Sequence, residues 1–148
     1  MKSVVGVCLA AVILGGGVAS AATAAGTDLL RANPKRVNFG TKAVGTFTVK
    51  GSTIANAGSS DVLVQTSAVR MPDQFSWGLL PGQTCPIFSP ELLAAGESCD
   101  IVAAFRPEDF FVGLEDVAVL QVTATDPSTG ATLDTVLVEF RGVGKSSP

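Results

Sequence analysis

The sequence has neither histidine nor tyrosine in its 148 residues. Without histidine the chain cannot form a Ser-His-Asp or Cys-His nucleophile system, and it has no histidine general base. The usual zinc and copper ligand sets are excluded for the same reason. We therefore expect a protein that is not an enzyme and that binds no metal or other cofactor.

The sequence also lacks an apolar run long enough to cross a membrane, which takes about 20 residues. The one apolar stretch, residues 4–18, is glycine-rich; it follows Met1-Lys2 and leads into small residues. This pattern predicts a signal peptide over residues 1–24, cleaved after Ala21 or Ala24, rather than an anchoring helix. No hydrophobic tail closes the sequence, so we expect no membrane anchor after cleavage. We predict an exported protein, located in the periplasm, at the cell surface or outside the cell.

Cleavage would change both the charge and the cysteine count. It would remove Lys2 and leave nine basic residues against thirteen acidic ones, which argues against a nucleic-acid partner. It would also remove Cys8 and leave Cys85 and Cys99 as an even pair in an oxidising compartment. These two cysteines are too far apart for a redox C-x-x-C motif, so we predict a structural disulfide. Two free buried thiols are the alternative.

Short apolar runs separated by Gly, Pro, Asn and Ser predict an all-β protein without helical periodicity. We expect about seven strands in two antiparallel sheets over residues 37–144, after a flexible lead (25–36) and before a short tail (145–148). Residues 90–95 are the one place suited to a helical turn, which Ser89 would cap and Gly96 would end. A change of apolar parity near Gly51 predicts a β-bulge there. The expected strands cover residues 37–39, 47–54, 62–64, 75–77, 99–105, 118–124 and 136–140.

Four motifs, in order along the chain, resemble those of the immunoglobulin-like modules called ASH or Hydin-like domains. They are Val37-Asn38-Phe39-Gly40, Asn56-Ala57-Gly58, the LAAGESCDI segment at 93–101 that continues into Phe105-Arg106-Pro107, and VEFRGVG at 138–144. The sequence is most similar to the bacterial secreted type called choice-of-anchor D, in which a cysteine precedes the L-x-x-G-x-x-C segment as Cys85 does. The resemblance implies an immunoglobulin-like sandwich.

The glycine, proline, asparagine and aromatic residues of these motifs predict core positions, turns and strand ends. Phe39 and Phe105 are expected in the core, and Pro107 should end a strand because it has no N–H to donate. Asn56 and Gly58 tolerate positive φ and are therefore suited to a turn. Gly142 and Gly144 are expected to release the last strand.

Three features are candidates for function. Phe110 and Phe111 follow Pro107, and as neighbours they point to opposite faces, so that one of them is a candidate for exposure; they either form an interaction patch or pack under the rim of the sandwich. Trp77, together with Phe75, is either a stacking platform for a ligand or a core residue. An open first or last strand is the third candidate, since an exported sandwich can exchange a strand with a partner. A carboxylate group near the Phe pair is a weaker calcium or hydrolase candidate: Glu108, Asp109, Glu115 and Asp116.

We accordingly expect an exported, non-catalytic structural or protein-binding module that acts through an edge strand or a surface loop. Its partner would be another envelope or extracellular protein. A pilus-type subunit or assembly chaperone is the alternative, and a carbohydrate-binding or hydrolytic protein is a further one.

Overall fold

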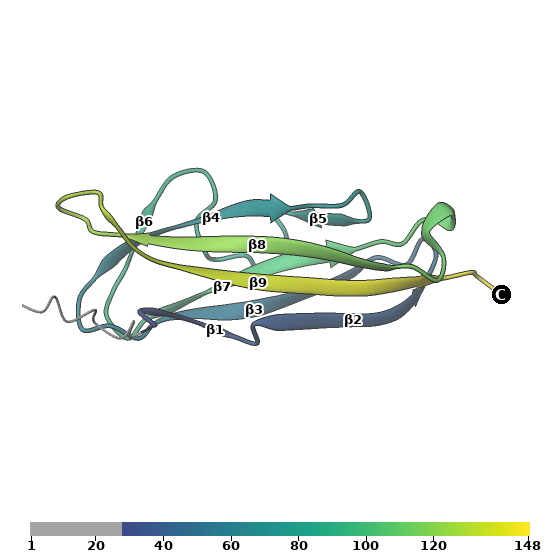
Figure 1. The fold of residues 1–148 in the computed structure, drawn as a ribbon, viewed down its shortest axis with the longest axis horizontal. Helices are drawn as coiled ribbons and strands as arrows, with labels where there is room; N and C mark the ends of the chain where they lie inside the picture. The colour runs from purple at the N-terminus through teal and green to yellow at the C-terminus, as the bar shows by residue number, and fades with distance from the viewer. Residues whose placement is uncertain (1–27) are drawn as a thin grey trace, which may run out of the picture.

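The computed structural model describes residues 28–148, so the predicted signal peptide lies outside the described part of the chain. No helix among the described residues is long and apolar enough to span a membrane. Residues 28–148 form nine strands and one short 3₁₀ turn (Figure 1). These elements are β1 (Leu30–Asn33), β2 (Arg36–Ala43), β3 (Thr48–Asn56), β4 (Val62–Arg70), β5 (Phe75–Trp77), β6 (Glu91–Leu93), β7 (Ser98–Phe105), η1 (Asp109–Phe111), β8 (Glu115–Thr125) and β9 (Thr132–Lys145).

The strands form two packed sheets. One has the order β1-β3-β7-β5 and the other β2-β9-β8-β4-β6. All pairs are antiparallel except β2 with β9, which is parallel. The structure confirms the predicted all-β, immunoglobulin-like sandwich of two sheets with one disulfide.

Two strands were not expected from the sequence. β1 lies inside the supposed flexible lead, where Leu30 is buried and its N–H donates to the Asp134 carboxylate at 2.8 Å. β6 replaces the helical turn expected at residues 90–95, because Leu93 and its neighbours pair with β4 and Leu93 enters the core. Both predictions were wrong for the same reason: a strand this short is defined by its partner rather than by its own pattern.

The core lies between the sheets and follows the predicted alternation of side chains. Four phenylalanines form its aromatic part: Phe39 and Phe75 both contact Phe105, with ring centroids 5.6 and 4.8 Å away, and Phe39 lies 6.5 Å from Phe140. The remaining inward residues of β8 and β9 are also buried, as expected: Ala118, Leu120, Val122, Ala124, Val136 and Val138.

Gly142 does not end the last strand, as the sequence had led us to expect. β9 continues to Lys145, and Gly142 lies in it beneath the Phe105 ring. A Cβ atom at position 142 would lie 2.5 Å from that ring. The glycine is therefore needed for close packing, not for strand exit.

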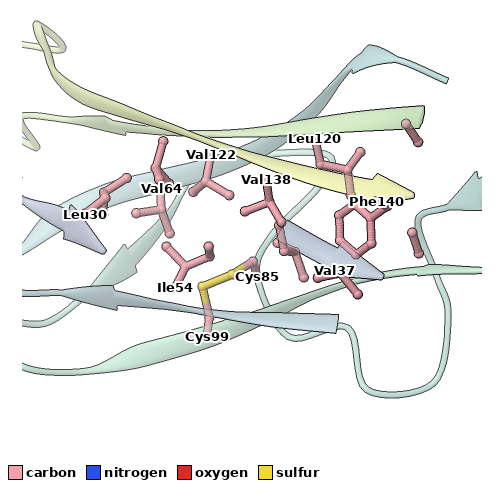
Figure 2. Packing of buried hydrophobic residues seen from close by; sticks show 14 of the residues in the cluster. Leu30, Val37, Ile54, Val64, Cys85, Cys99, Leu120, Val122, Val138 and Phe140 are labelled. Carbon is pink, nitrogen blue, oxygen red and sulfur yellow. A yellow bond between two sulfur atoms is a disulfide. The ribbon is translucent and has the colours of Figure 1, made fainter. Parts of the chain in front are cut away.

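The predicted disulfide between Cys85 and Cys99 is present and lies in the core, beside Ile54 (Figure 2). It anchors residues 78–90, which we call the strap, because they cross from one sheet to the other. On one side the N–H groups of Thr84 and Cys85 donate to the Asp100 carbonyl oxygen of β7; on the other side Thr66 N–H of β4 donates to the Pro86 carbonyl oxygen. The strap closes one side of the sandwich.

The expected bulge at Gly51 is absent, since β3 and β7 pair in one continuous register. Val49 lies on the outer face, so the apparent change of parity came from treating an outward valine as a core residue. The inward position before Ile54 is Ser52, which is buried and donates from its hydroxyl to the Pro34 carbonyl oxygen at 2.7 Å. A register shift occurs instead in β2, between Asn38 and Gly40.

Asn56 is fully buried and joins three segments, and its φ is not positive. Its side-chain amide donates to the carbonyl oxygens of Leu93 and Ser60, and its Oδ1 accepts from Gly58 N–H. Gly58 also lacks positive φ, and a Cβ there would lie 2.3 Å from the end of the Leu29 side chain, which would have to move. The motif therefore fixes the β3–β4 connection through side-chain hydrogen bonds and close packing.

We expect Asn56→Ala to lower the free energy of unfolding by about 2 kcal/mol, because it leaves the buried Leu93 carbonyl oxygen without this donor. Urea denaturation measures the change. Asn38→Ala is the control: Asn38 is exposed and makes one local hydrogen bond to Gly40, so its effect should stay within about 0.5 kcal/mol. Equal effects of the two substitutions would contradict this role of Asn56.

Candidate functional site

The segment after β7 forms an ordered loop at one end of the sandwich. Pro107 stops β7 and is buried, and residues 107–114, which we call the η1 loop, contain η1 and lead into β8. The loop lies at the end where β9 terminates and the C terminus lies (Figure 1). Its position follows from the lengths of β7 and β8, which both run to this end.

Backbone hydrogen bonds hold the η1 loop on two neighbouring segments. Gly45 N–H of the β2–β3 turn donates to the Pro107 carbonyl oxygen at 2.9 Å. Gly113 N–H donates to the Gly144 carbonyl oxygen of β9, also at 2.9 Å, and Val112 forms a parallel bridge with Gly144. The loop therefore has a defined conformation before any partner arrives, which reduces the entropic cost of binding.

Gln74 supports the loop from beneath. Gln74 is buried, with only 3 % of its surface exposed. Its Oε1 accepts from Glu108 N–H at 3.3 Å, and its Nε2 donates to the Asp116 carboxylate at 3.1 Å. One side chain thus links the start of the η1 loop to the start of β8. Nothing in the sequence marked Gln74, because a buried glutamine has the same local pattern as an exposed one.

The η1 loop presents Phe110 almost entirely to solvent, with 92 % of its surface exposed. Phe111 is half-buried and lines a hollow of about 380 Å³ with Met71 and Pro72. Phe110 borders a second hollow, of about 360 Å³, with Val44 and neighbouring loop residues. Val112 and Leu114 are exposed as well, so this end of the molecule carries several adjacent apolar side chains on a fixed backbone.

Trp77 is not part of this surface. It is half-buried, packs against the core, and lies in β5 opposite Ala103. It lines neither of the two hollows next to Phe110 and Phe111. Of the three aromatic candidates, the structure therefore brings together Phe110 and Phe111 and leaves Trp77 elsewhere.

The carboxylates near the loop are not gathered into one cluster. Glu115 pairs with Arg141 at 3.3 Å, and Asp116 accepts from Gln74. Glu108 and Asp109 line the hollow beside Phe110. Among residues 28–148 no group of three or more Cys, Asp or Glu side chains is arranged to hold a metal ion, so the structure does not bring the four carboxylates together as the calcium alternative would require. The four carboxylates are close together in the sequence, but the η1 loop separates their side chains.

The edges of the sheets also differ from the expectation. β9, the last strand, lies between β2 and β8 and is not an edge strand, so that half of the edge-strand hypothesis was wrong. The edges are β1 and β5 in one sheet and β2 and β6 in the other. β2 is the longest of these, with eight residues.

An ion-pair network on the outer face ties β2 to β9. Glu139 of β9 accepts from Arg141 at 2.9 Å and from Arg36 of β2 at 3.1 Å. Hydrogen bonds from Arg141 and Arg36 hold the pKa of the Glu139 carboxyl below its usual value. The carboxylate therefore stays ionised at neutral pH and neutralises part of the positive charge beside β2.

Comparison with known proteins supports the fold. No family model matches the sequence, and no curated protein matches it. Among solved structures the chain is similar to an ASH/PapD-like domain of human CEP192, at a TM-score of 0.59 and 14 % identity, over 82 % of this chain and 88 % of that one. It is also similar to WR4, an MSP family member of C. elegans, at a TM-score of 0.51 and 14 % identity, over 78 % and 99 % of the two chains.

A third similar structure is the E. coli chaperone DraB, at a TM-score of 0.51 and 14 % identity. The similarity covers 76 % of this chain but only 53 % of DraB. At these identities the similarity establishes a common fold and nothing about activity. The immunoglobulin-like fold expected from the resemblance to ASH domains is therefore confirmed.

Proposed function

We propose that this chain is an exported, non-catalytic protein-binding module that contacts its partner through the η1 loop, with Phe110 as the central residue. Export rests on the predicted signal peptide and on the disulfide, a bond typical of oxidising compartments. The resemblance to the secreted choice-of-anchor D type agrees with this location. The partner would be another envelope or extracellular protein.

One observation carries this proposal: an almost fully exposed phenylalanine is fixed on a hydrogen-bonded loop. An exposed apolar side chain on a rigid backbone gains from burial by a partner and loses little conformational entropy on binding. Exposed aromatic residues flanked by polar ones are typical of protein interfaces. Glu108 and Asp109 beside Phe110 would form the polar rim.

The proposal is tested by co-purification from the envelope fraction after gentle cross-linking. We expect Phe110→Ala to lose the partner, with at least about a tenfold lower recovery if this ring acts as an interface hot spot. The matched control is Phe88→Ala: Phe88 is also an exposed phenylalanine, at 80 %, but it lies in the strap. Equal recovery with both variants, or no partner with the unmodified protein, would contradict the proposal.

A pilus-type subunit or assembly chaperone remains the alternative function. The fold of this chain is compatible with that alternative, as the similarity to the chaperone DraB indicates. The two functions differ in assembly state, since a pilus subunit would form polymers. Ladders in unboiled gels would favour the pilus subunit, whereas a protein that stays monomeric would exclude it.

A further inference from the structure

Positive charge is concentrated on one long side of this acidic protein. Residues 29–60 contain no Asp or Glu but hold five of the ten basic residues of the chain. This segment forms β1, β2 and β3, which lie together along one side of the sandwich (Figure 1). The five residues, which we call the basic edge, are Arg31, Lys35, Arg36, Lys42 and Lys50.

Most of this charge is not neutralised within the chain. Arg36 pairs with Glu139, but none of the ion pairs among the described residues involves the other four cations. Three of those four side chains, those of Arg31, Lys35 and Lys50, are exposed. Because the whole chain is negative, the basic edge is a local reversal of charge that would attract an anionic partner.

The basic edge lies around β2, the longest edge strand among the described residues. β2 pairs with β9 on one side only, so no strand of the described residues covers its other side. Two of its backbone groups already have side-chain partners: Lys50 donates to the Asn38 carbonyl oxygen, and Gly40 N–H donates to Asn38 Oδ1. Lys42 lies opposite Gly144 in the β2–β9 register, on the face of β2 that looks toward the other sheet. Lys50 reaches across from β3, and Lys35 lies immediately before β2.

Lys50 makes the most informative contact. Its Nζ donates to the Asn38 carbonyl oxygen of β2 at 2.7 Å and lies 5.9 Å from the centre of the Phe39 ring. A lysine side chain from the neighbouring sheet thus occupies a backbone acceptor of the edge strand. A partner strand that offered its own N–H and a carboxylate would satisfy both Asn38 and the released ammonium group.

We propose that β2 binds an extended, acidic polypeptide segment as an added strand, and that Lys35, Lys42 and Lys50 contact its carboxylates. This inference rests on the proposed role as a protein-binding module and assigns a second surface, separate from the η1 loop. The positive charge favours an acidic segment over a second copy of this chain as the added strand. A second copy that paired through the same edge would place lysines against lysines, which is repulsive. An acidic strand supplies both the hydrogen bonds and the opposite charge.

Fluorescence anisotropy with three labelled peptides, each as long as β2, tests the proposal. The first alternates glutamate and valine, the second has glutamine in place of glutamate, and the third has proline in place of valine and cannot pair as a strand. We expect the first peptide to bind, the other two to bind at least about fivefold more weakly, and added salt to weaken the first. Hydrogen exchange should slow at residues 36–43 on binding.

Two double variants of equal net charge locate the site. Lys35→Gln/Lys50→Gln should weaken binding of the first peptide about fivefold, whereas Arg70→Gln/Arg106→Gln, two exposed arginines outside the basic edge, should not. Equal binding of the three peptides, or equal loss in both variants, would overturn the proposal. Binding to phosphatidylglycerol vesicles without binding to the peptide would overturn it in favour of an anionic lipid.

The failure of this inference can be told apart from a failure of the proposed function. Phe110→Ala should bind the acidic peptide normally, and Lys35→Gln/Lys50→Gln should still recover the partner that depends on Phe110. Loss of peptide binding in Phe110→Ala would show that the two surfaces are one site and would overturn the assignment to β2.

Discussion

Replacing Phe105 with alanine is expected to be among the most destabilising single changes in this protein, at about 4 kcal/mol. The side chain is fully buried, contacts Phe39 and Phe75, and covers the backbone at Gly142. Truncation removes its burial energy and leaves a cavity between the sheets that β-sheet backbones cannot close by a small shift. Equilibrium unfolding in urea, followed by the fluorescence of Trp77, measures the loss.

Phe110→Ala is the control for this prediction. The same chemical truncation at Phe110, five residues beyond Phe105, is expected to change stability by no more than about 0.5 kcal/mol, because Phe110 is 92 % exposed. A large loss at Phe110 would mean that its ring packs against the protein in solution. A loss below about 1 kcal/mol at Phe105 would contradict the packing described for the aromatic core.

Removing the disulfide in Cys85→Ala/Cys99→Ala is expected to cost about 3 kcal/mol, because a closed loop of this length restricts the unfolded chain. The loss should be accompanied by local loosening. The strap depends on this anchor, so the amides at positions 84 and 85 should exchange much faster in the variant than those in the middle of β8. Urea denaturation and hydrogen exchange together measure both effects.

The unmodified protein treated with a reductant provides the matched control. Its midpoint of unfolding should fall to that of the double alanine variant, because both lack the same cross-link. If reduction leaves the midpoint unchanged while the substitutions lower it, the loss comes from packing of the cysteine side chains and the cross-link contributes little. A double variant as stable as the unmodified protein would contradict the role assigned to the disulfide.

The sequence was sufficient to predict the parts of the fold that have a strong alternating pattern. The inward residues of β7, β8 and β9, the hairpin at residues 126–130 and the pairing of Cys85 with Cys99 all agree with the structure. Each of these depends on local periodicity, on a turn signal or on the count of cysteines. Such signals survive in a single sequence because burial on one face dictates every second residue.

The parts that the sequence did not predict depend on partners distant along the chain. β1 is a strand because β3 lies beside it, and Gly142 is a glycine because Phe105 lies above it. Asn56 likewise looks like a turn residue until its hydrogen bond to Leu93, 37 residues away, is known. Local propensity contains none of this information.

The candidate site was predicted in part. Exposure of one phenylalanine of the pair was expected, and Phe110 is the exposed one. The support from Gln74 and the separation of Trp77 from the η1 loop were visible only in the structure. The charges of the basic edge are visible in the sequence as a segment, residues 29–60, without acidic residues, but only the sheet topology places them around one edge strand.

Site-specific photo-cross-linking tests the central claim, that the η1 loop contacts a protein partner. A benzophenone amino acid placed at position 110 is compared with the same residue at position 88, another exposed phenylalanine on the strap. We predict one discrete adduct of higher mass at position 110 in the envelope fraction and none at position 88. No adduct at either position, or the same adducts at both, would contradict the account.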